Sequence, residues 1–204
     1  MYPELVATIA SFQIGMDLKE ERKDILLGLA QSIDRERKAQ QSVNLMFICT
    51  HNSRRSQFAQ IWAQAAVAYY ELDNILCYSG GTEETVLFEG VVETLQHQGF
   101  FIGVVAQGAN PIYSIKYEPN GVPILGFSKR YTSFFHPADQ FIAIMTCSQA
   151  TDACPFVSGA KQSIALAYED PQVFDGQYEQ KAMYSKKSLE IAKEIFYVFA
   201  QLKK

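Results

Sequence analysis

Short apolar runs alternate with amphipathic segments along most of this chain. Four runs have the length and the apolar, partly β-branched character of buried strands, and they cover residues 43–49, 75–79, 140–146 and 164–167. Apolar residues recur at helical spacing over residues 55–71, 83–97 and 186–204. Strands that alternate with helices predict an α/β fold, here a four-stranded parallel open sheet flanked by helices.

The first 42 residues precede this alternation and are expected to form a helical extension. Ile25, Leu26, Leu29 and Ile33 recur on one face among charged residues, which is typical of an amphipathic helix. The α/β domain is then expected to span residues 43–204. An apolar stripe must be covered, so we expect the extension to dock on this domain or to form a homodimer with a second copy.

Residues 106–138 interrupt the alternation and predict an insertion that contains a β-hairpin. Two strand-like runs at 112–117 and 124–127 flank the pair Asn120 and Gly121, which favours a tight turn. The insertion is rich in Tyr and Phe and also carries basic residues. It could line a substrate pocket, or it could be an arm that packs against a partner.

Composition narrows the possible partners and compartment. The chain has 204 residues with 48% apolar content, enough for a domain with a core, and its net charge of −4 argues against general affinity for nucleic acid. No apolar run approaches the ~20 residues of a membrane span, and no signal peptide is indicated, so a cytoplasmic protein is expected. Its four cysteines are then expected to be catalytic, redox-active or buried. No metal and no tightly bound cofactor is expected.

The first predicted strand ends on Cys49, and the loop after it reaches Arg55 at the start of a helix. The residues of this loop are Thr50, His51, Asn52, Ser53 and Arg54. None of them is proline, so each keeps a backbone N–H that a tight loop can turn toward one centre. The pattern therefore predicts an oxyanion-binding loop.

A spacing of five residues would let Cys49 and Arg55 act on the same oxyanion. Arg55 can donate paired hydrogen bonds to two oxygens while the Cys49 sulfur approaches the central atom, and Ser56 can donate to the sulfur. The inward N–H groups and Arg55 would favour the thiolate form of Cys49. Alternatively, Cys49 is an inert core thiol and Arg55 a solvated residue. The strand before the loop and the helix after it favour the chemical role.

The stretch from Phe47 to Gln57, with the sequence FICTHNSRRSQ, resembles the active-site loop of a known enzyme family. It is similar to the low-molecular-weight protein tyrosine phosphatases and, more closely, to the thioredoxin-coupled arsenate reductases that share their fold. The resemblance implies that Cys49 is the nucleophile, Arg55 the oxyanion clamp and Ser56 the partner of the thiolate. It also implies that Asn52 holds the loop.

Two loop positions depart from the family pattern. His51 stands where the family usually has glycine, so a turn that tolerates positive φ is expected to take a side chain here. Arg54 replaces a second loop cysteine, which adds positive charge and removes one possible redox partner.

A second pair of cysteines resembles the redox segment of the thioredoxin-coupled reductases. The strand over 140–146 ends on Cys147, and six residues separate it from Cys154. The strand order that the resemblance implies would place this strand beside the first one, so that Cys49 and Cys147 open onto one crevice. The resemblance then implies a relay in which Cys49 attacks arsenate, Cys147 attacks the Cys49 sulfur, and Cys154 takes over the disulfide for thioredoxin. The other interpretation is two buried thiols on a loop.

The last predicted strand leads to Asp170 and Pro171, and in the resembled family an Asp-Pro pair carries the general acid beside the pocket. Asp170 could protonate a leaving oxygen, although Asp before Pro is also an ordinary turn signal. Asp175 is a weaker candidate for the same role.

Three hypotheses follow from these patterns. The first is arsenate reduction through Cys49, Cys147 and Cys154, with thioredoxin as the external reductant. The second is hydrolysis of phosphomonoesters such as phosphotyrosine through a phospho-cysteine, with Arg55 and Asp170. The third is a non-catalytic sensor of phosphate or phosphopeptides, if His51 and the insertion cover the loop.

Overall fold

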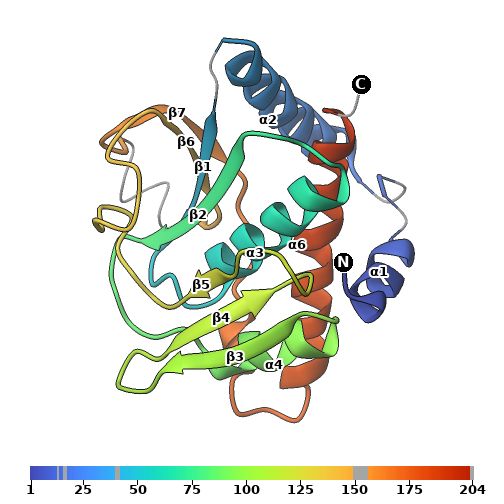
Figure 1. The fold of residues 1–204 in the computed structure, drawn as a ribbon, viewed down its shortest axis with the longest axis vertical. Coiled ribbons are helices and arrows are strands. Elements are labelled where there is room, and N and C mark those ends of the chain that lie inside the picture. The colour runs from blue at the N-terminus through green and yellow to red at the C-terminus, as the bar shows by residue number, and fades with distance from the viewer. Residues whose placement is uncertain (13, 16–17, 40–41, 149–155, 203–204) are drawn as a thin grey trace.

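The computed structural model describes residues 1–12, 14–15, 18–39, 42–148 and 156–202. Its centre is a parallel sheet of four strands in the order β2-β1-β6-β7 (Figure 1). The strands are β1 (Val43–Cys49), β2 (Ile75–Gly81), β6 (Phe141–Met145) and β7 (Ala160–Ala165). The predicted sheet is confirmed. Its inner strands β1 and β6 are buried almost throughout, as expected for continuous apolar runs in a parallel sheet.

Three helices gather beside this sheet (Figure 1). They are α3 (Arg55–Tyr69), α4 (Glu89–His97) and α6 (Gln180–Ala200), with α3 against β1 and β2 and α6 against α3 and α4. Trp62 of α3 is fully buried and packs edge-on against Phe12 and Phe100. Its indole N–H donates to Ser188 Oγ at 2.9 Å, so its one polar atom is satisfied.

The N-terminal extension consists of α1 (Pro3–Ala10) and α2 (Glu20–Ala39). Leu26, Leu29 and Ile33 of α2 are buried within the same chain, whereas Ile25 is 39% exposed and was wrongly assigned to the apolar face. An ion pair of Arg22 with Glu194, at 2.7 Å, joins α2 to α6. The apolar stripe is thus covered by the α/β domain, and dimerisation stays a prediction.

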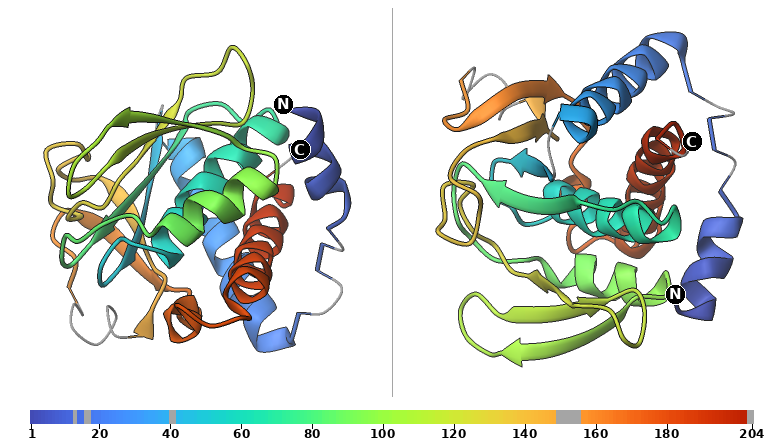
Figure 2. Two further views of the ribbon diagram at one scale, coloured as in Figure 1. Left: turned by 90° about the horizontal axis from the view of Figure 1, so that it is seen from below. Right: turned by 45° about the horizontal axis from the view of Figure 1, so that its top comes forward.

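The predicted hairpin is present and belongs to a second, antiparallel sheet in the order β3-β4-β5. Its strands are β3 (Phe101–Ala106), β4 (Ile112–Lys116) and β5 (Ile124–Gly126), and they lie beside α4, apart from the parallel sheet (Figure 2). Strand β3 was not predicted, although Phe101–Ala106 is an apolar run. Most of its residues are solvent-exposed, so apolar character alone does not mark a buried strand here.

Several element boundaries differ from the sequence prediction, among them that of α6, which begins at Gln180 rather than at 186. Strand β7 begins at Ala160 and ends at Ala165, because an edge strand can carry exposed polar residues that give no apolar signal. Helix α4 begins only at Glu89, because the backbone from 82 to 88 is hydrogen-bonded to the Cys49 loop instead. Within the described ranges, no helix is long and apolar enough to cross a membrane.

Candidate active site

The loop between β1 and α3 surrounds the sulfur of Cys49 with polar groups. This residue is only 2% exposed, and its Sγ accepts a hydrogen bond from the backbone N–H of Asn52 at 3.2 Å. The Ser56 Oγ lies 3.1 Å from the same sulfur and accepts from Asn52 Nδ2 at 2.8 Å. Because that amide already donates to it, Ser56 has its own proton available for the sulfur. The expected pairing of Cys49 with Ser56 is therefore present.

Asn52 holds the loop in a conformation that few residues tolerate. Its φ of 48° lies in the left-handed region, where Asn is among the better accepted residues. Its Oδ1 accepts from Gln57 Nε2 at 3.0 Å and from the backbone N–H of Lys129 at 3.1 Å. The expectation that the unusual backbone conformation would fall on His51 is wrong, since φ is positive at Asn52 instead.

The carbonyl groups of the loop are bound from outside, which orients its peptide units. The carbonyls of Cys49, Thr50 and Ser53 accept from the backbone N–H groups of Thr82, Glu83 and Phe88, respectively. A peptide unit is planar and its N–H points opposite to its C=O. Outward carbonyls therefore turn the following N–H groups toward the side of the loop that holds the sulfur.

The carbonyls of His51 and Asn52 are bound in the same way. His51 O accepts from Ser128 Oγ at 2.8 Å, and Asn52 O accepts from Gln57 Nε2 at 3.1 Å. Gly81 allows this close approach, because a Cβ there would lie 2.6 Å from Thr50 O. We call the groups from 82–88, Gln57 and 127–129 the loop brace. Sequence reasoning did not identify it.

Removal of the Asn52 side chain is expected to weaken the loop brace. The variant Asn52→Ala lacks the hydrogen bond from Asn52 Nδ2 to Ser56 Oγ. It also lacks the Asn52 Oδ1 acceptor, so Gln57 Nε2 has one acceptor fewer and the backbone N–H of Lys129 has none. It also places Ala at φ 48°. We expect a loss of about 2–4 kcal/mol in the free energy of unfolding, measured by urea denaturation.

A matched control separates backbone strain from the lost hydrogen bonds. Asn74 also has a left-handed φ, of 62°, and lies outside the loop. Asn74→Ala should therefore cost only the strain, about 1 kcal/mol. Equal losses in the two variants would contradict the role of the Asn52 side chain.

Arg55 lies at the start of α3 and is 8% exposed. Its Nη1 donates to Tyr168 O at 3.2 Å, and its Nη2 pairs with the carboxylate of Asp170. Its buried Nε has no hydrogen-bond partner in the described part of the chain. The guanidinium therefore keeps one unsatisfied donor inside the site.

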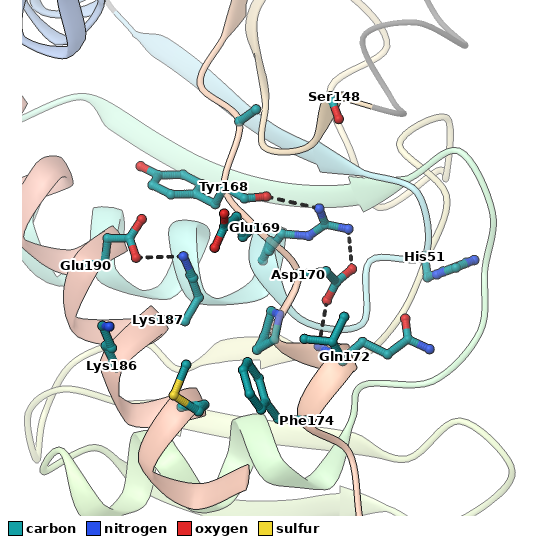
Figure 3. A pocket seen from close by; sticks show the side chains of 15 residues that line it. His51, Ser148, Tyr168, Glu169, Asp170, Gln172, Phe174, Lys186, Lys187 and Glu190 are labelled. Carbon is teal, nitrogen blue, oxygen red and sulfur yellow. Dashed lines mark hydrogen bonds and ion pairs between the residues drawn. The ribbon is translucent and has the colours of Figure 1, made fainter. Parts of the chain in front are cut away.

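Asp170 follows β7 and caps the short 3₁₀ helix η1 (Pro171–Phe174), with its Oδ1 accepting from the Gln172 N–H at 3.1 Å. Its other oxygen faces Arg55 (Figure 3). A hollow of about 10 Å³ lies between Cys49, Arg55 and Asp170 and is also lined by loop residues. The structure thus brings these three predicted site residues together from β1, α3 and the segment after β7.

The two unusual loop residues also line this hollow, and each has a side-chain partner on another segment. The side chain of His51 is 40% exposed, with Nε2 3.7 Å from a Glu83 carboxylate oxygen, and Figure 3 shows it directed away from Asp170. Arg54 pairs with the carboxylate of Asp175, and its Nε donates to the Tyr184 hydroxyl at 2.6 Å. Arg54 therefore anchors the start of α3 to η1 and α6, and Asp175 is occupied by that contact.

Cys147 is fully buried two residues after the end of β6, which pairs with β1. Its Sγ lies 3.6 Å from Thr50 Oγ1, so the second thiol contacts the oxyanion loop itself. Cys154 lies outside the described residues. The remaining thiol, Cys77 of β2, is buried away from the loop, and burial raises its pKa.

A wide cleft of about 850 Å³ opens beside the hollow (Figure 3). Arg55 and Asp170 line it, as do Phe174, Met183 and Lys186. Lys187 and Glu190 of α6 also line it and pair with each other at 2.6 Å. The cleft is large enough for a side chain or small molecule attached to the oxyanion.

Comparison of the sequence with protein-family models and with curated proteins gives no match. The fold, in contrast, matches solved structures over most of their length. A YwlE mutant from Bacillus subtilis has a TM-score of 0.54 at 16% identity, over 80% of this chain and 100% of that one. A low-molecular-weight phosphotyrosine phosphatase from Vibrio cholerae O395 has a TM-score of 0.53 at 15% identity, over 80% of this chain and 98% of that one.

An arsenate reductase in a phosphate-bound state is also similar, with a TM-score of 0.51 at 20% identity over 78% of this chain and 98% of the other. Another YwlE structure, with a TM-score of 0.52, is described as an arginine phosphatase. The chain therefore has the fold shared by low-molecular-weight phosphatases and arsenate reductases. At these identities the likeness establishes the fold and leaves the reaction to be argued from the site.

Proposed function

We propose that this chain is an enzyme that uses a Cys49 thiolate on tetrahedral oxyanions, and that its reaction is arsenate reduction. The observation that carries the proposal is the loop around Cys49, whose carbonyls are bound from outside so that its N–H groups face the sulfur. Arg55, with a spare buried donor, and Asp170 complete the site. Such a ring of donors suits an oxyanion above a nucleophile.

The proposed chemistry begins with attack of the Cys49 thiolate on As(V), while Asp170 donates a proton to the departing oxygen as water leaves. The thiolate of Cys147 then attacks the Cys49 sulfur. The electron pair of the S–As bond stays on arsenic, which leaves as arsenite, and a disulfide joins Cys49 to Cys147. Cys154 displaces Cys49 from it, and the dithiol of thioredoxin reduces the final disulfide of Cys147 with Cys154.

The support for reduction over simple hydrolysis is the place of Cys147. A buried thiol in contact with Thr50 of the oxyanion loop has no role in hydrolysis. In the relay, by contrast, the thiol of Cys147 must reach the sulfur of Cys49, and the two residues lie at the ends of the neighbouring strands β6 and β1.

Phosphomonoester hydrolysis is the second candidate, and the cleft of about 850 Å³ favours it. Arsenate alone needs no such space, whereas a phosphorylated side chain does. In that reaction Asp170 protonates the leaving oxygen and then activates the water that hydrolyses the phospho-cysteine. The sensor hypothesis keeps one argument, because His51 lines the hollow beside Cys49 and Arg55.

Paired assays on Cys147→Ser distinguish these reactions. If the relay operates, the variant should lose thioredoxin-dependent arsenate reduction to background, because serine cannot form the disulfide. Its hydrolysis of a small aryl phosphate should stay within about threefold of wild type. Both rates are measured on the same preparation.

Cys77→Ser is the matched control, since it alters a buried thiol on β2 that does not face the loop. It should leave both activities unchanged. If arsenate reduction survives in Cys147→Ser, the relay is wrong. If wild type binds phosphate yet shows neither activity, the sensor hypothesis is the one that stands.

A further inference from the structure

A second cavity lies between β2 and the insertion, and we call it the rear cavity. Its volume is about 350 Å³, and it shares no lining residue with the cleft beside Asp170. Its polar lining includes Cys77, Tyr78, Tyr117, Lys129 and His136. Exposed apolar side chains, among them Leu76 and Val122, also line it and offer contact to an apolar ligand body.

Lys129 places an ammonium group at this cavity without a counter-ion. The side chain is 4% exposed, and its Nζ donates to Phe127 O at 3.1 Å and lies 4.3 Å from the centre of the Phe127 ring. No ion pair joins Lys129 to an acidic residue within the described ranges. A buried charge with so few partners is costly, and an anion in the cavity would offset that cost.

His136 contributes a second unsatisfied atom to the same cavity. Its Nδ1 lies 2.9 Å from Tyr131 O, and a carbonyl can only accept, so Nδ1 carries a proton. Burial, and in smaller part the charge of Lys129, lowers the pKa of His136 and keeps the ring neutral. Its Nε2 is then an acceptor, and it is buried without a hydrogen-bond partner among the described residues. This atom calls for a ligand that donates an O–H or N–H.

The other titratable side chains of the cavity carry no charge at neutral pH. Burial raises the pKa values of Cys77, Tyr78 and Tyr117, so all three stay protonated. The ammonium of Lys129 is then the single charge in the lining. The ligand is therefore expected to match the positive charge of Lys129, the buried acceptor of His136 and the apolar side chains that line the cavity.

We propose that the rear cavity binds a small hydroxy acid with an apolar body, its carboxylate on Lys129 Nζ and its hydroxyl donating to His136 Nε2. A monocarboxylate matches the single charge, and an aromatic or short aliphatic body fits beside the apolar lining. The proposal concerns binding alone and stands independently of the reaction at Cys49.

Calorimetric titration with 4-hydroxyphenylacetate tests this site on the full chain, with saturating phosphate present to fill the hollow at Arg55. We expect saturable binding with one site per chain. In Lys129→Met the affinity should fall at least about tenfold, because the charge-assisted hydrogen bond is lost. Phenylacetate, which lacks the hydroxyl, should bind wild type about fivefold more weakly. Lys181→Met is the matched control, since that side chain is 80% exposed, and it should bind like wild type.

The pH dependence gives an independent readout of Lys129. Burial lowers the pKa of Lys129 from 10.5 to about 8, so the unliganded protein loses the charge as pH rises through about 8. Affinity for the carboxylate should weaken above that pH. The buried charge also opposes folding most strongly below pH 8 and less as pH rises toward 10.5. Lys129→Met should therefore be folded, with a higher Tm than wild type at pH 7 and a smaller difference at high pH.

Three results would overturn the proposal. The first is the absence of saturable binding to wild type at millimolar 4-hydroxyphenylacetate. The second is equal affinity in wild type and folded Lys129→Met, which would remove the ammonium as the recognising group. The third is binding that phosphate abolishes, because the acid would then occupy the hollow at Arg55.

Discussion

Cys49→Ser is expected to abolish turnover of arsenate and of aryl phosphates while phosphate binding persists. The serine hydroxyl can still accept from the Asn52 N–H and approach Ser56, so the loop keeps its shape. A serine hydroxyl is not ionised at neutral pH and is a far weaker nucleophile than the proposed thiolate. We expect kcat to fall by at least about 10⁴-fold.

The measurement combines steady-state rates with calorimetric phosphate binding on one preparation. The dissociation constant for phosphate should stay within about fivefold of wild type, because the loop N–H groups and Arg55 are unchanged. Cys77→Ser again serves as the control for the loss of a buried thiol. Activity of Cys49→Ser within tenfold of wild type would show that Cys49 is not the nucleophile.

Arg55→Lys is the second variant with a large expected effect. Arg55 reaches Asp170 and Tyr168 O with separate nitrogens, which fixes the plane of its guanidinium, and it keeps Nε unsatisfied. A lysine offers one point charge on a flexible stem and cannot reproduce this geometry. We expect kcat/KM to fall about 10³-fold and phosphate affinity to fall at least about tenfold.

The neighbouring arginine provides the control for charge in this loop. Arg54 is paired with Asp175 and lies over the Phe88 ring, 4.4 Å from its centre. Arg54→Lys should therefore lower Tm yet leave phosphate affinity within about threefold of wild type. If Arg54→Lys and Arg55→Lys lose phosphate affinity equally, the effect belongs to the general charge of the loop and Arg55 is not its specific clamp.

The parallel sheet and the position of Cys49 could be predicted because each leaves a local signal in the sequence. Buried strands such as β1 and β6 are continuous apolar runs, and the switch to helical spacing marks the start of α3. The edge strand β7 begins with exposed polar residues that leave no such mark, so it was placed too late. Strand β3 is an apolar run that was not recognised, and it is mostly exposed in the antiparallel sheet.

The loop brace could not be predicted, because its contacts join residues far apart in the sequence. Ser128 and Lys129 each contact the loop across 77 positions, and no spacing rule connects them to it. Gln57 is a polar residue next to the apolar face of α3, and this position was only a weak indication that its side chain contacts the loop. Its full burial, with its amide shared between Asn52 and Phe127, becomes visible only in three dimensions.

The outward hydrogen bonds of the catalytic loop also determine when the site can form during folding. Cys49 and Arg55 are neighbours in sequence, but their geometry depends on 82–88 and on the insertion that is translated afterwards. Non-local contacts of this kind form late, because closure of the long intervening loops must come first. Until the insertion docks, a nascent or refolding chain would lack an assembled oxyanion loop around its sulfur. The rate at which phosphate begins to protect Cys49 from alkylation would therefore report that docking step.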